Sequence, residues 1–158
     1  MKHYIYLVGQ ISVDEPETYK WRELVREHFK NYDCFNIIDP CNNAFNQTML
    51  GKYKHIDAKR QQVYKENGID VLVSKDYSFV KKSTIAIADL NIYDPKKAII
   101  GSFYELAWYF LHPEKTVIGV FSGDESLHTA HPFVKASVTT WVKSHKEACE
   151  LIKFYFKD

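Results

Sequence analysis

Short apolar runs alternate along this chain with segments whose apolar residues recur every three or four positions. The runs are rich in β-branched and aromatic residues and predict strands, whereas the periodic segments predict amphipathic helices. A strand–helix order kept along the whole length favours parallel strands whose helical crossovers cover both faces of one sheet. The alternation therefore predicts one α/β domain over residues 1–158, with about five strands in three α/β/α layers.

The expected elements can be given by residue range. Strands are expected at residues 3–9, 34–38, 83–90 and 116–121, with an edge-like strand between 136 and 142. Helices are expected after Pro16, over 69–82, from Gly101 to Pro113, and after Ser144. Periodicity assigns the following side chains to the inner faces of these helices: Trp21, Leu24, Val25, His28, Phe29, Val73, Phe79, Val80, Phe103, Leu106, Ala107, Phe110, Leu111, Ala148, Leu151, Ile152, Tyr155 and Phe156. Residues 41–67 fit either a lid or long connection over the strand ends, or two poor helices.

Length, hydrophobicity and charge exclude several classes of protein. A chain of 158 residues that is 46% hydrophobic can bury a core, which excludes disorder as its main state. A net charge of +1 gives no strong attraction to nucleic acid or to a membrane surface. No apolar run approaches the roughly 20 residues that span a bilayer, and the first residues lack signal-peptide architecture. We therefore expect a soluble, cytoplasmic protein.

Cysteine and histidine spacing gives no sign of a metal centre or a disulfide framework. The three cysteines, Cys34, Cys41 and Cys149, are odd in number and show no Cys-x-x-Cys spacing. The seven histidines form no His-Glu-x-x-His arrangement. We therefore expect neither a metal site nor disulfides.

Polar residues directly follow the first predicted strand, at the edge where α/β sheets bind ligands. Gly9 allows a ligand to approach the backbone, and Gln10 and Ser12 offer hydrogen-bonding groups. The run is neither Gly-x-Gly-x-x-Gly nor a P-loop, so no dinucleotide or nucleoside triphosphate cradle is predicted. An ordinary strand-to-helix turn explains the same residues.

Glu105 lies near the start of a predicted helix, and two explanations fit it. Ser102 and Glu105 have the Ser-x-x-Glu spacing of a capping box, which needs no function. Alternatively, a carboxylate at a helix N-terminus can act as a nucleophile on a sugar carbon.

Asp76, on the preceding predicted helix, suits either a solvated surface position or the second acid of a two-carboxylate site. Cleavage of an N-glycosidic bond needs one group to capture the sugar and another to protonate the leaving base. The sequence does not show whether Asp76 and Glu105 meet.

Three blocks of sequence resemble the nucleoside 2-deoxyribosyltransferase family, especially its small phage and bacterial members. The first is Tyr-Ile-Tyr-Leu-Val-Gly-Gln-Ile-Ser at 4–12, followed by Tyr-Lys-Trp-Arg at 19–22. The second is Asp-x-x-x-Val-x-x-Ser-x-Ile-x-Ile-Ala-Asp at 76–89. The third, Ile-Gly-Ser-Phe-Tyr-Glu-Leu-Ala at 100–107, is similar to the family's Gly-Thr-x-x-Glu-Ile-x-Ala. His-Pro-Phe-Val at 131–134 also resembles a loop of the small members.

The resemblance implies a flavodoxin-like, Rossmann-like doubly wound fold and a double-displacement reaction without a metal or organic cofactor. Glu105 matches the nucleophile that attacks C1′ of a 2′-deoxynucleoside, Tyr6 a tyrosine that orients it, and Asp76 an acid that handles the base. The deoxyribosyl-enzyme is then resolved by an acceptor base or by water. The residues that the resemblance assigns to the sugar pocket are Gly9, Gln10, Gly101 and Ser102. It also implies a homodimer or larger homo-oligomer in which the segment from His128 to Phe133, with His131, reaches a neighbour's site.

Departures from the family pattern leave other readings open. Ile99 and Ile100 stand where Asp-Ser is common, and Asp89 or Asp94 are the candidates to replace that missing acid. Related glycosidases hydrolyse deoxynucleoside monophosphates, and the candidates to hold a 5′-phosphate are Gly9-Gln10-Ile11-Ser12 and Arg22, although a surface helix position also suits Arg22. A non-catalytic nucleotide-binding module, with Glu105 only capping its helix, and an interaction protein using exposed aromatic side chains are the two rival functions.

Overall fold

Five parallel strands form one sheet in the computed structural model, which describes residues 1–12, 14–42 and 68–157. The order across the sheet is β2-β1-β3-β4-β5, and every neighbouring pair is parallel. The strands are β1 (His3–Gly9), β2 (Phe35–Ile38), β3 (Ile85–Asp89), β4 (Thr116–Val120) and β5 (Thr140–Val142). Because 2-1-3-4-5 is the strand order of flavodoxin-like folds, the predicted doubly wound fold is confirmed.

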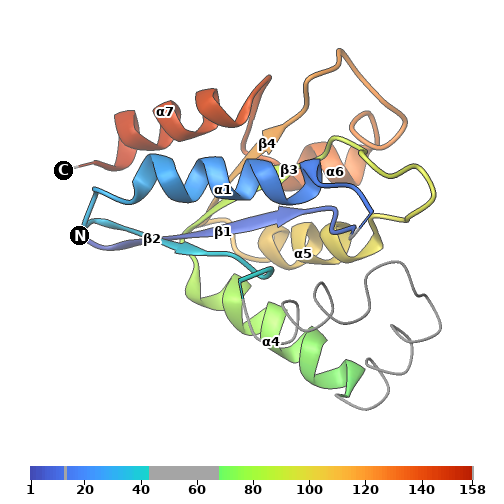
Figure 1. Ribbon diagram of the computed structural model, residues 1–158, viewed down its shortest axis with the longest axis horizontal. Helices are drawn as coiled ribbons and strands as arrows, with labels where there is room; N and C mark the ends of the chain where they lie inside the picture. The colour runs from blue at the N-terminus through green and yellow to red at the C-terminus, as the bar shows by residue number, and fades with distance from the viewer. Residues whose placement is uncertain (13, 43–67, 158) are drawn as a thin grey trace.

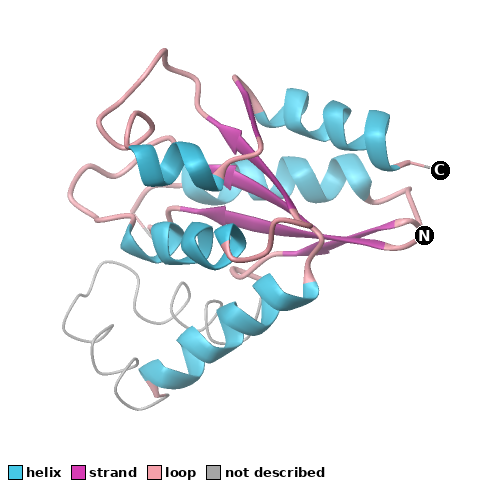
Figure 2. Ribbon diagram, turned by 180° about the vertical axis from the view of Figure 1, so that it is seen from behind, coloured by secondary structure: helices cyan, strands magenta, loops and turns pink. Residues whose placement is uncertain are grey.

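The helices form a layer on each face of this sheet (Figures 1 and 2). Their bounds are α1 (Glu17–Phe29), α4 (Ile69–Lys82), α5 (Ile100–Phe110), α6 (Pro132–Ser137) and α7 (His145–Phe156). Helices α1 and α7 pack together on one face, whereas α4, α5 and α6 cover the other. In the part of the chain that the structure describes, no helix is long and apolar enough to cross a membrane.

Side chains of β1 alternate between the two layers, as the two-residue period of a strand requires. Ile5 and Leu7 belong to the core beneath α1 and α7, and Tyr6 and Val8 to the core beneath α4, α5 and α6. All four are fully buried. The alternation therefore directs the Tyr6 side chain into the layer that contains α4 and α5.

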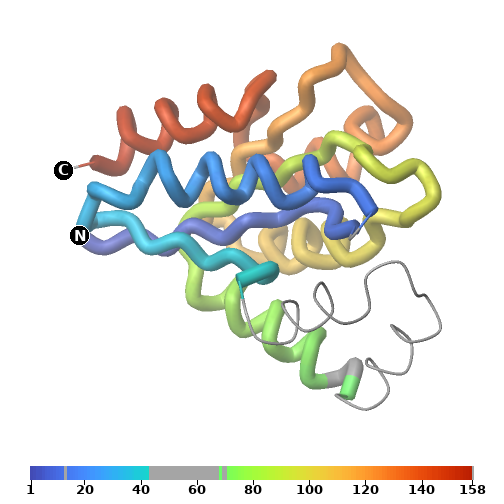
Figure 3. The backbone as a smooth tube through the Cα atoms, viewed as in Figure 1, coloured from blue at the N-terminus to red at the C-terminus, as the bar shows by residue number. Residues whose placement is uncertain are grey.

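The carboxyl ends of the strands meet at one edge of the sheet, at the end opposite the N-terminus and the last turn of α7 (Figure 3). Gly9 and Asp89, the last residues of β1 and β3, are paired in register there. The chain leaves β1 through α1 on one face and enters β3 from α4 on the other. This is the topological switch point, where folds of this kind bind ligands.

The predicted edge strand over 136–142 is only partly present. Residues 132–137 form α6, and the strand is limited to Thr140–Val142. Pro132 occupies the first helical turn and the His131 side chain caps it by accepting a hydrogen bond from the Phe133 amide, so these local signals outweigh β-branched composition.

Several helix faces also differ from the predicted ones. On α5 the inner face carries Ser102, Glu105, Leu106 and Tyr109, so the apolar stripe read from the sequence points partly outward. The following residues were predicted inside and are exposed: Leu24, Val73, Ala107, Phe110, Leu111 and Tyr155. Periodicity alone failed on α5 because two buried positions are polar and several exposed ones are apolar.

Candidate active site

A cavity of about 180 Å³ lies where β1 ends and α5 begins, at the switch point of the sheet. Its walls come from the ends of β1 and β2, from α4, and from the first turns of α5 with the residues before it. The lining residues are Gly9, Gln10, Ile11, Pro40, Asp76, Ala98, Ile99, Gly101, Ser102 and Glu105. The structure thus gathers in one cavity six of the residues predicted from the sequence: Gly9, Gln10, Asp76, Gly101, Ser102 and Glu105.

Glu105 lies in the second turn of α5 and is 9% exposed. The helix begins at Ile100 with Ile99 at the N-cap position, and no side chain makes a capping hydrogen bond there. Ser102 is therefore the third helical residue rather than the cap. The capping-box explanation of the Ser-x-x-Glu spacing is wrong, and the burial of Glu105 needs another reason.

The Tyr6 hydroxyl supplies a partner for this buried carboxyl group by donating a hydrogen bond to Glu105 Oε1. Burial and the charge of Glu105 raise the pKa of Tyr6 far above its usual value, so the hydroxyl stays protonated and remains a donor. Burial raises the pKa of Glu105 to about 8, although the hydrogen bond from Tyr6 opposes the rise. The repulsive charge of Asp76 contributes to it.

Asp76 reaches the cavity from the middle of α4. Its Oδ1 is buried and has no hydrogen-bond partner among the described residues, although the Lys75 ammonium lies 3.4 Å away. Burial raises the pKa of Asp76, and Lys75 opposes the rise. A carboxyl group with a raised pKa and an unused oxygen is suited to hold a proton and give it to a bound molecule.

Gln10 and Ser12 fasten the loop that precedes α5. Gln10 Nε2 donates to the carbonyls of Asp94 (2.8 Å) and Lys97 (2.9 Å), and its Oε1 accepts from two amides of the same loop. Ser12 Oγ donates to Asp94 Oδ2 at 2.8 Å. Both side chains are thus engaged in positioning the loop that carries Ala98 and Ile99 to the cavity wall.

Both side-chain oxygens of Asp89 have partners among residues that do not line the cavity. Oδ1 accepts from the backbone and side chain of Asn91, and Oδ2 accepts from the Tyr93 hydroxyl at 2.8 Å. His145 Nε2 lies 3.2 Å from Oδ2. Neither Asp89 nor Asp94 lines the cavity, and Ile99 stands there as an apolar wall.

Arg22 is buried beneath the cavity wall and does not line it. Its Nη2 donates to the carbonyl oxygen of Gly9 at 3.0 Å. His131 lines a different cavity, of about 340 Å³, between α5 and α6, together with Phe103 and Phe133. The structure therefore does not bring these two predicted residues into the cavity of Glu105.

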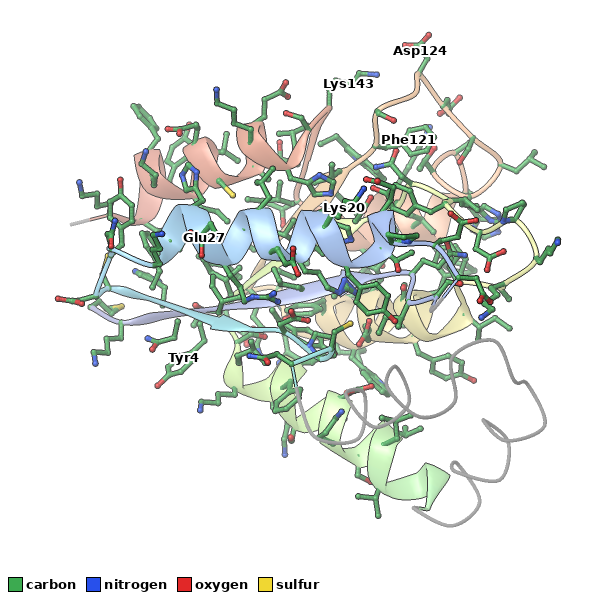
Figure 4. The ribbon with its side chains drawn as sticks, in the orientation of Figure 1. Tyr4, Lys20, Glu27, Phe121, Asp124 and Lys143 are labelled. Carbon is green, nitrogen blue, oxygen red and sulfur yellow. The ribbon has the colours of Figure 1, made fainter. Side chains whose placement is uncertain are left out.

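A third cavity, of about 300 Å³, lies beyond the carboxyl ends of β4 and β5. Phe121, Asp124 and Lys143 line it, and Figure 4 shows these three side chains together, well away from α4. Lys143 lies 3.5 Å from Asp124 and donates to the Gly123 carbonyl. These polar groups already have partners within the chain.

Lys75 is the charged residue near the cavity that the sequence reading missed. Its side chain is 26% exposed and lies above the ring of Phe79, and its charge influences both acids. A lysine beside an aspartate on a helix carries no special signal in a sequence. In the described ranges, no group of three or more His, Cys, Asp or Glu side chains is arranged to hold a metal ion.

Comparison with known proteins adds evidence on the fold. No protein-family model matches the chain, and no curated protein matches it. A solved 2-deoxyribosyltransferase from Bacillus psychrosaccharolyticus is 17% identical, with a TM-score of 0.54 over 92% of this chain and 89% of that one. The CMP N-glycosidase BcmB of Clostridium botulinum is 13% identical, with a TM-score of 0.50 over 96% and 99%.

The Mn²⁺-bound response regulator Rcp1 is similar to the same degree, with 16% identity and a TM-score of 0.50 over 98% of this chain and 95% of that one. Likeness at this level establishes a shared fold and leaves function to be argued from the site. The resemblance read from the sequence is thus confirmed for the fold, which this chain shares with a 2-deoxyribosyltransferase, an N-glycosidase and a response regulator.

Proposed function

We propose that the chain cleaves the N-glycosidic bond of 2′-deoxynucleosides or their 5′-monophosphates and transfers the deoxyribosyl group to another base or to water. One observation carries the proposal: Glu105, oriented by Tyr6, shares a small cavity at the switch point with a second acid, Asp76. Two carboxyl groups and an orienting hydroxyl are the groups that glycosidic cleavage needs. A 2-deoxyribosyltransferase and a CMP N-glycosidase share the fold, which supports the same chemistry.

In the first step, a Glu105 oxygen attacks C1′ and forms a C–O bond. The C1′–N bond breaks, its electron pair stays on the base nitrogen, and Asp76 supplies the proton that neutralises the leaving base. In the second step, water or a second base attacks C1′, Glu105 leaves as a carboxylate, and Asp76 takes up the released proton. Both displacements invert C1′, so the configuration is retained overall.

The pKa of about 8 at Glu105 sets a condition on this mechanism. Only the ionised carboxylate is nucleophilic, so the rate should rise with pH as Glu105 loses its proton. Asp76 must meanwhile keep a proton, and its raised pKa favours that. The negative charge of Asp76 opposes the ionisation of Glu105, which favours a state in which the pair holds one proton.

Small residues leave room for the sugar beside Glu105. A Cβ built on Gly101 would meet nothing within 4 Å, so this part of the cavity is open. We assign Gly9, Gly101 and Ser102 to the wall of the sugar subsite, and Ile99 to an apolar contact with the base or the sugar ring. Gln10 and Ser12 act through the loop they fasten.

A homo-oligomer is part of the proposal. The outward face of α5 carries Ile100, Tyr104 and Phe110, which are 61%, 61% and 58% exposed. Large exposed apolar side chains that gather on one helix favour contact with another protein surface. Sedimentation analysis of the purified chain should show a dimer or larger species, which Tyr104→Lys should dissociate.

Product analysis tests the activity. The chain is incubated with deoxynucleosides and deoxynucleoside monophosphates, with and without free adenine or cytosine, and base release or exchange is followed by chromatography. Exchange that requires an acceptor base identifies a transferase, whereas release without an acceptor identifies a hydrolase. The matched control is Glu105→Gln, which keeps the shape of the side chain and removes the nucleophile.

We expect Glu105→Gln to fold and to lose activity by several orders of magnitude. Binding of a nucleotide without any turnover, unchanged in Glu105→Gln, would overturn the enzymatic proposal in favour of a binding module.

A further inference from the structure

Arg22, on α1, is a buried permanent charge that the proposed mechanism does not use. It is 1% exposed and is among the largest side chains removed from solvent. A guanidinium group stays protonated at any ordinary pH, so its burial is stable only if other groups satisfy its charge and its donors. The hydrogen-bond and charge partners of the Arg22 guanidinium therefore indicate its role.

The donors of Arg22 join the ends of two strands at the cavity. Nη2 donates to the carbonyl of Gly9, the last residue of β1, at 3.0 Å. Nε lies 3.3 Å from the Cys41 sulfur and 3.6 Å from Asp39 Oδ1, both just after β2. Gly9 and Pro40, which the guanidinium thereby holds, both line the cavity of Glu105. Nη1 is buried without a hydrogen-bond partner among the described residues.

The negative charge of Asp39 does not fully balance the charge of Arg22, because Asp39 also pairs with Arg26. Its Oδ2 is paired with Arg26, and its Oδ1 accepts a hydrogen bond from the Cys41 amide at 2.9 Å. Two arginines and one aspartate leave one excess positive charge beside the cavity wall. On the other side of that wall, Glu105 is a buried acid whose ionised form needs a positive charge.

Titratable and charged groups from four elements surround Glu105. Tyr6 of β1 donates a hydrogen bond to it, and Tyr109 of α5 is a further buried hydroxyl near it. From α4, Asp76 opposes its ionisation and Lys75 favours it, but these two form a pair with each other. From α1, the charge of Arg22 lowers the pKa of Glu105. Arg22 is thus the fully buried cation in this set.

We propose that Arg22 is a positioning residue of this site: its guanidinium ties the ends of β1 and β2 together beneath the cavity and supplies the buried positive charge that stabilises ionised Glu105. The proposal rests on the proposed role of Glu105, but its test needs no turnover. Arg22 does not touch the substrate in this assignment, which differs from the phosphate contact expected from the sequence.

Titration of Glu105 in the full chain without substrate is the test. The protein is labelled with ¹³C at the glutamate carboxyl carbon, and the Glu105 resonance is identified by its loss in Glu105→Gln. In Arg22→Met, we expect this resonance to titrate at a higher pH than in the wild type, since the stabilising cation is gone. Arg26→Met removes the same formal charge from a side chain that is 35% exposed, and solvent screening should make its effect smaller.

A second variant keeps the proposal testable if Arg22→Met fails to fold. Asp39→Asn keeps the oxygen that accepts from the Cys41 amide but removes the negative charge that competes for Arg22. Glu105 should then titrate at a lower pH than in the wild type. An unchanged Glu105 titration in either folded variant, or a larger effect of Arg26→Met than of Arg22→Met, would overturn the proposal.

The titration experiment and the activity assay can fail independently of each other. If base release is absent from the wild type while the titration moves as expected, the electrostatic role of Arg22 stands and the activity does not. If the activity is present and the titration does not move, Arg22 is only a structural residue.

Discussion

The Tyr6 hydroxyl donates a hydrogen bond to the Glu105 carboxyl group, joining the middle of β1 to the second turn of α5 across 99 positions of sequence. Both side chains are buried, and the bond is made in the layer beneath α4 and α5. It orients the carboxyl group toward the cavity that Asp76 also lines. The geometry of the proposed reaction depends on this contact.

Replacement of Tyr6 by Phe should lower kcat/KM by about 10- to 100-fold, because a hydrogen bond to a charged group contributes roughly 1.5–3 kcal/mol. The rate at low pH should fall more than the rate at high pH, since loss of the donor raises the pKa of Glu105 further. Steady-state kinetics from pH 6 to 10 measures both effects.

The matched control for this variant is Tyr109→Phe. Tyr109 is an equally buried tyrosine on α5, but its hydroxyl is bonded to Ser83. Removal of that hydroxyl should leave kcat/KM nearly unchanged. Equal losses in the two variants would show that packing, and not the bond to Glu105, is responsible.

The stability of the protein should depend on pH through Glu105. Its pKa is about 8 when folded and close to 4.5 when unfolded, so between these values the folded state binds the extra proton. Stability from this group is therefore fully present below about pH 4.5 and is lost as the pH rises toward 8.

Glu105→Gln has no such proton to lose, so its melting temperature relative to wild type should increase from pH 5 to pH 9. A difference of about 1 kcal/mol corresponds to roughly 2–4 °C in a protein of this size. Thermal unfolding at both pH values measures this, and a constant difference between the two proteins would contradict a raised pKa at Glu105.

Asp76→Asn should slow the release of bases that leave only when protonated, by about 10²- to 10⁴-fold. A nitrophenyl 2-deoxyriboside has a leaving group that needs no proton. The variant should therefore cleave it nearly as fast as the wild type does. Equal losses on both substrates would remove Asp76 from the role of acid and leave it a structural one.

Two glycines of the cavity should respond differently to a methyl group. Gly101→Ala adds it to open space in a helix and should stabilise the fold by about 0.5–1 kcal/mol while raising KM. Gly9→Ala places its Cβ 3.0 Å from the Trp21 ring and 3.2 Å from Asp89, and should destabilise the fold by about 1–3 kcal/mol. Denaturant titration with steady-state kinetics separates the two, and a destabilised Gly101→Ala would contradict the open wall.

The fold was predictable because its signals are local. Each strand of a parallel sheet buried on both faces is a continuous apolar run, and β1 and β3 show this plainly. Periodicity assigned the wrong inner face to α5, because tertiary packing there overrides the local pattern of apolar residues. Polar Ser102 and Glu105 are buried on the inner face of α5, where they line the cavity, whereas apolar Phe110 is exposed.

The sequence predicted many residues of the candidate site but not the part that each of them plays there. Glu105, Asp76 and Tyr6 follow from the sequence blocks, and the structure brings all three together. Gln10 could not be assigned to the loop it fastens, because its partners are backbone groups more than 80 positions away.

Identification of the covalent intermediate tests the central claim most directly. The wild-type chain is mixed with a deoxynucleoside, quenched in acid within the first turnover, digested and mapped by mass spectrometry. The account predicts a deoxyribosyl ester on Glu105, absent from Glu105→Gln and lost on addition of an acceptor base or on longer incubation in water. Rapid base release with no ester at Glu105, or with the sugar attached to another residue, would contradict it.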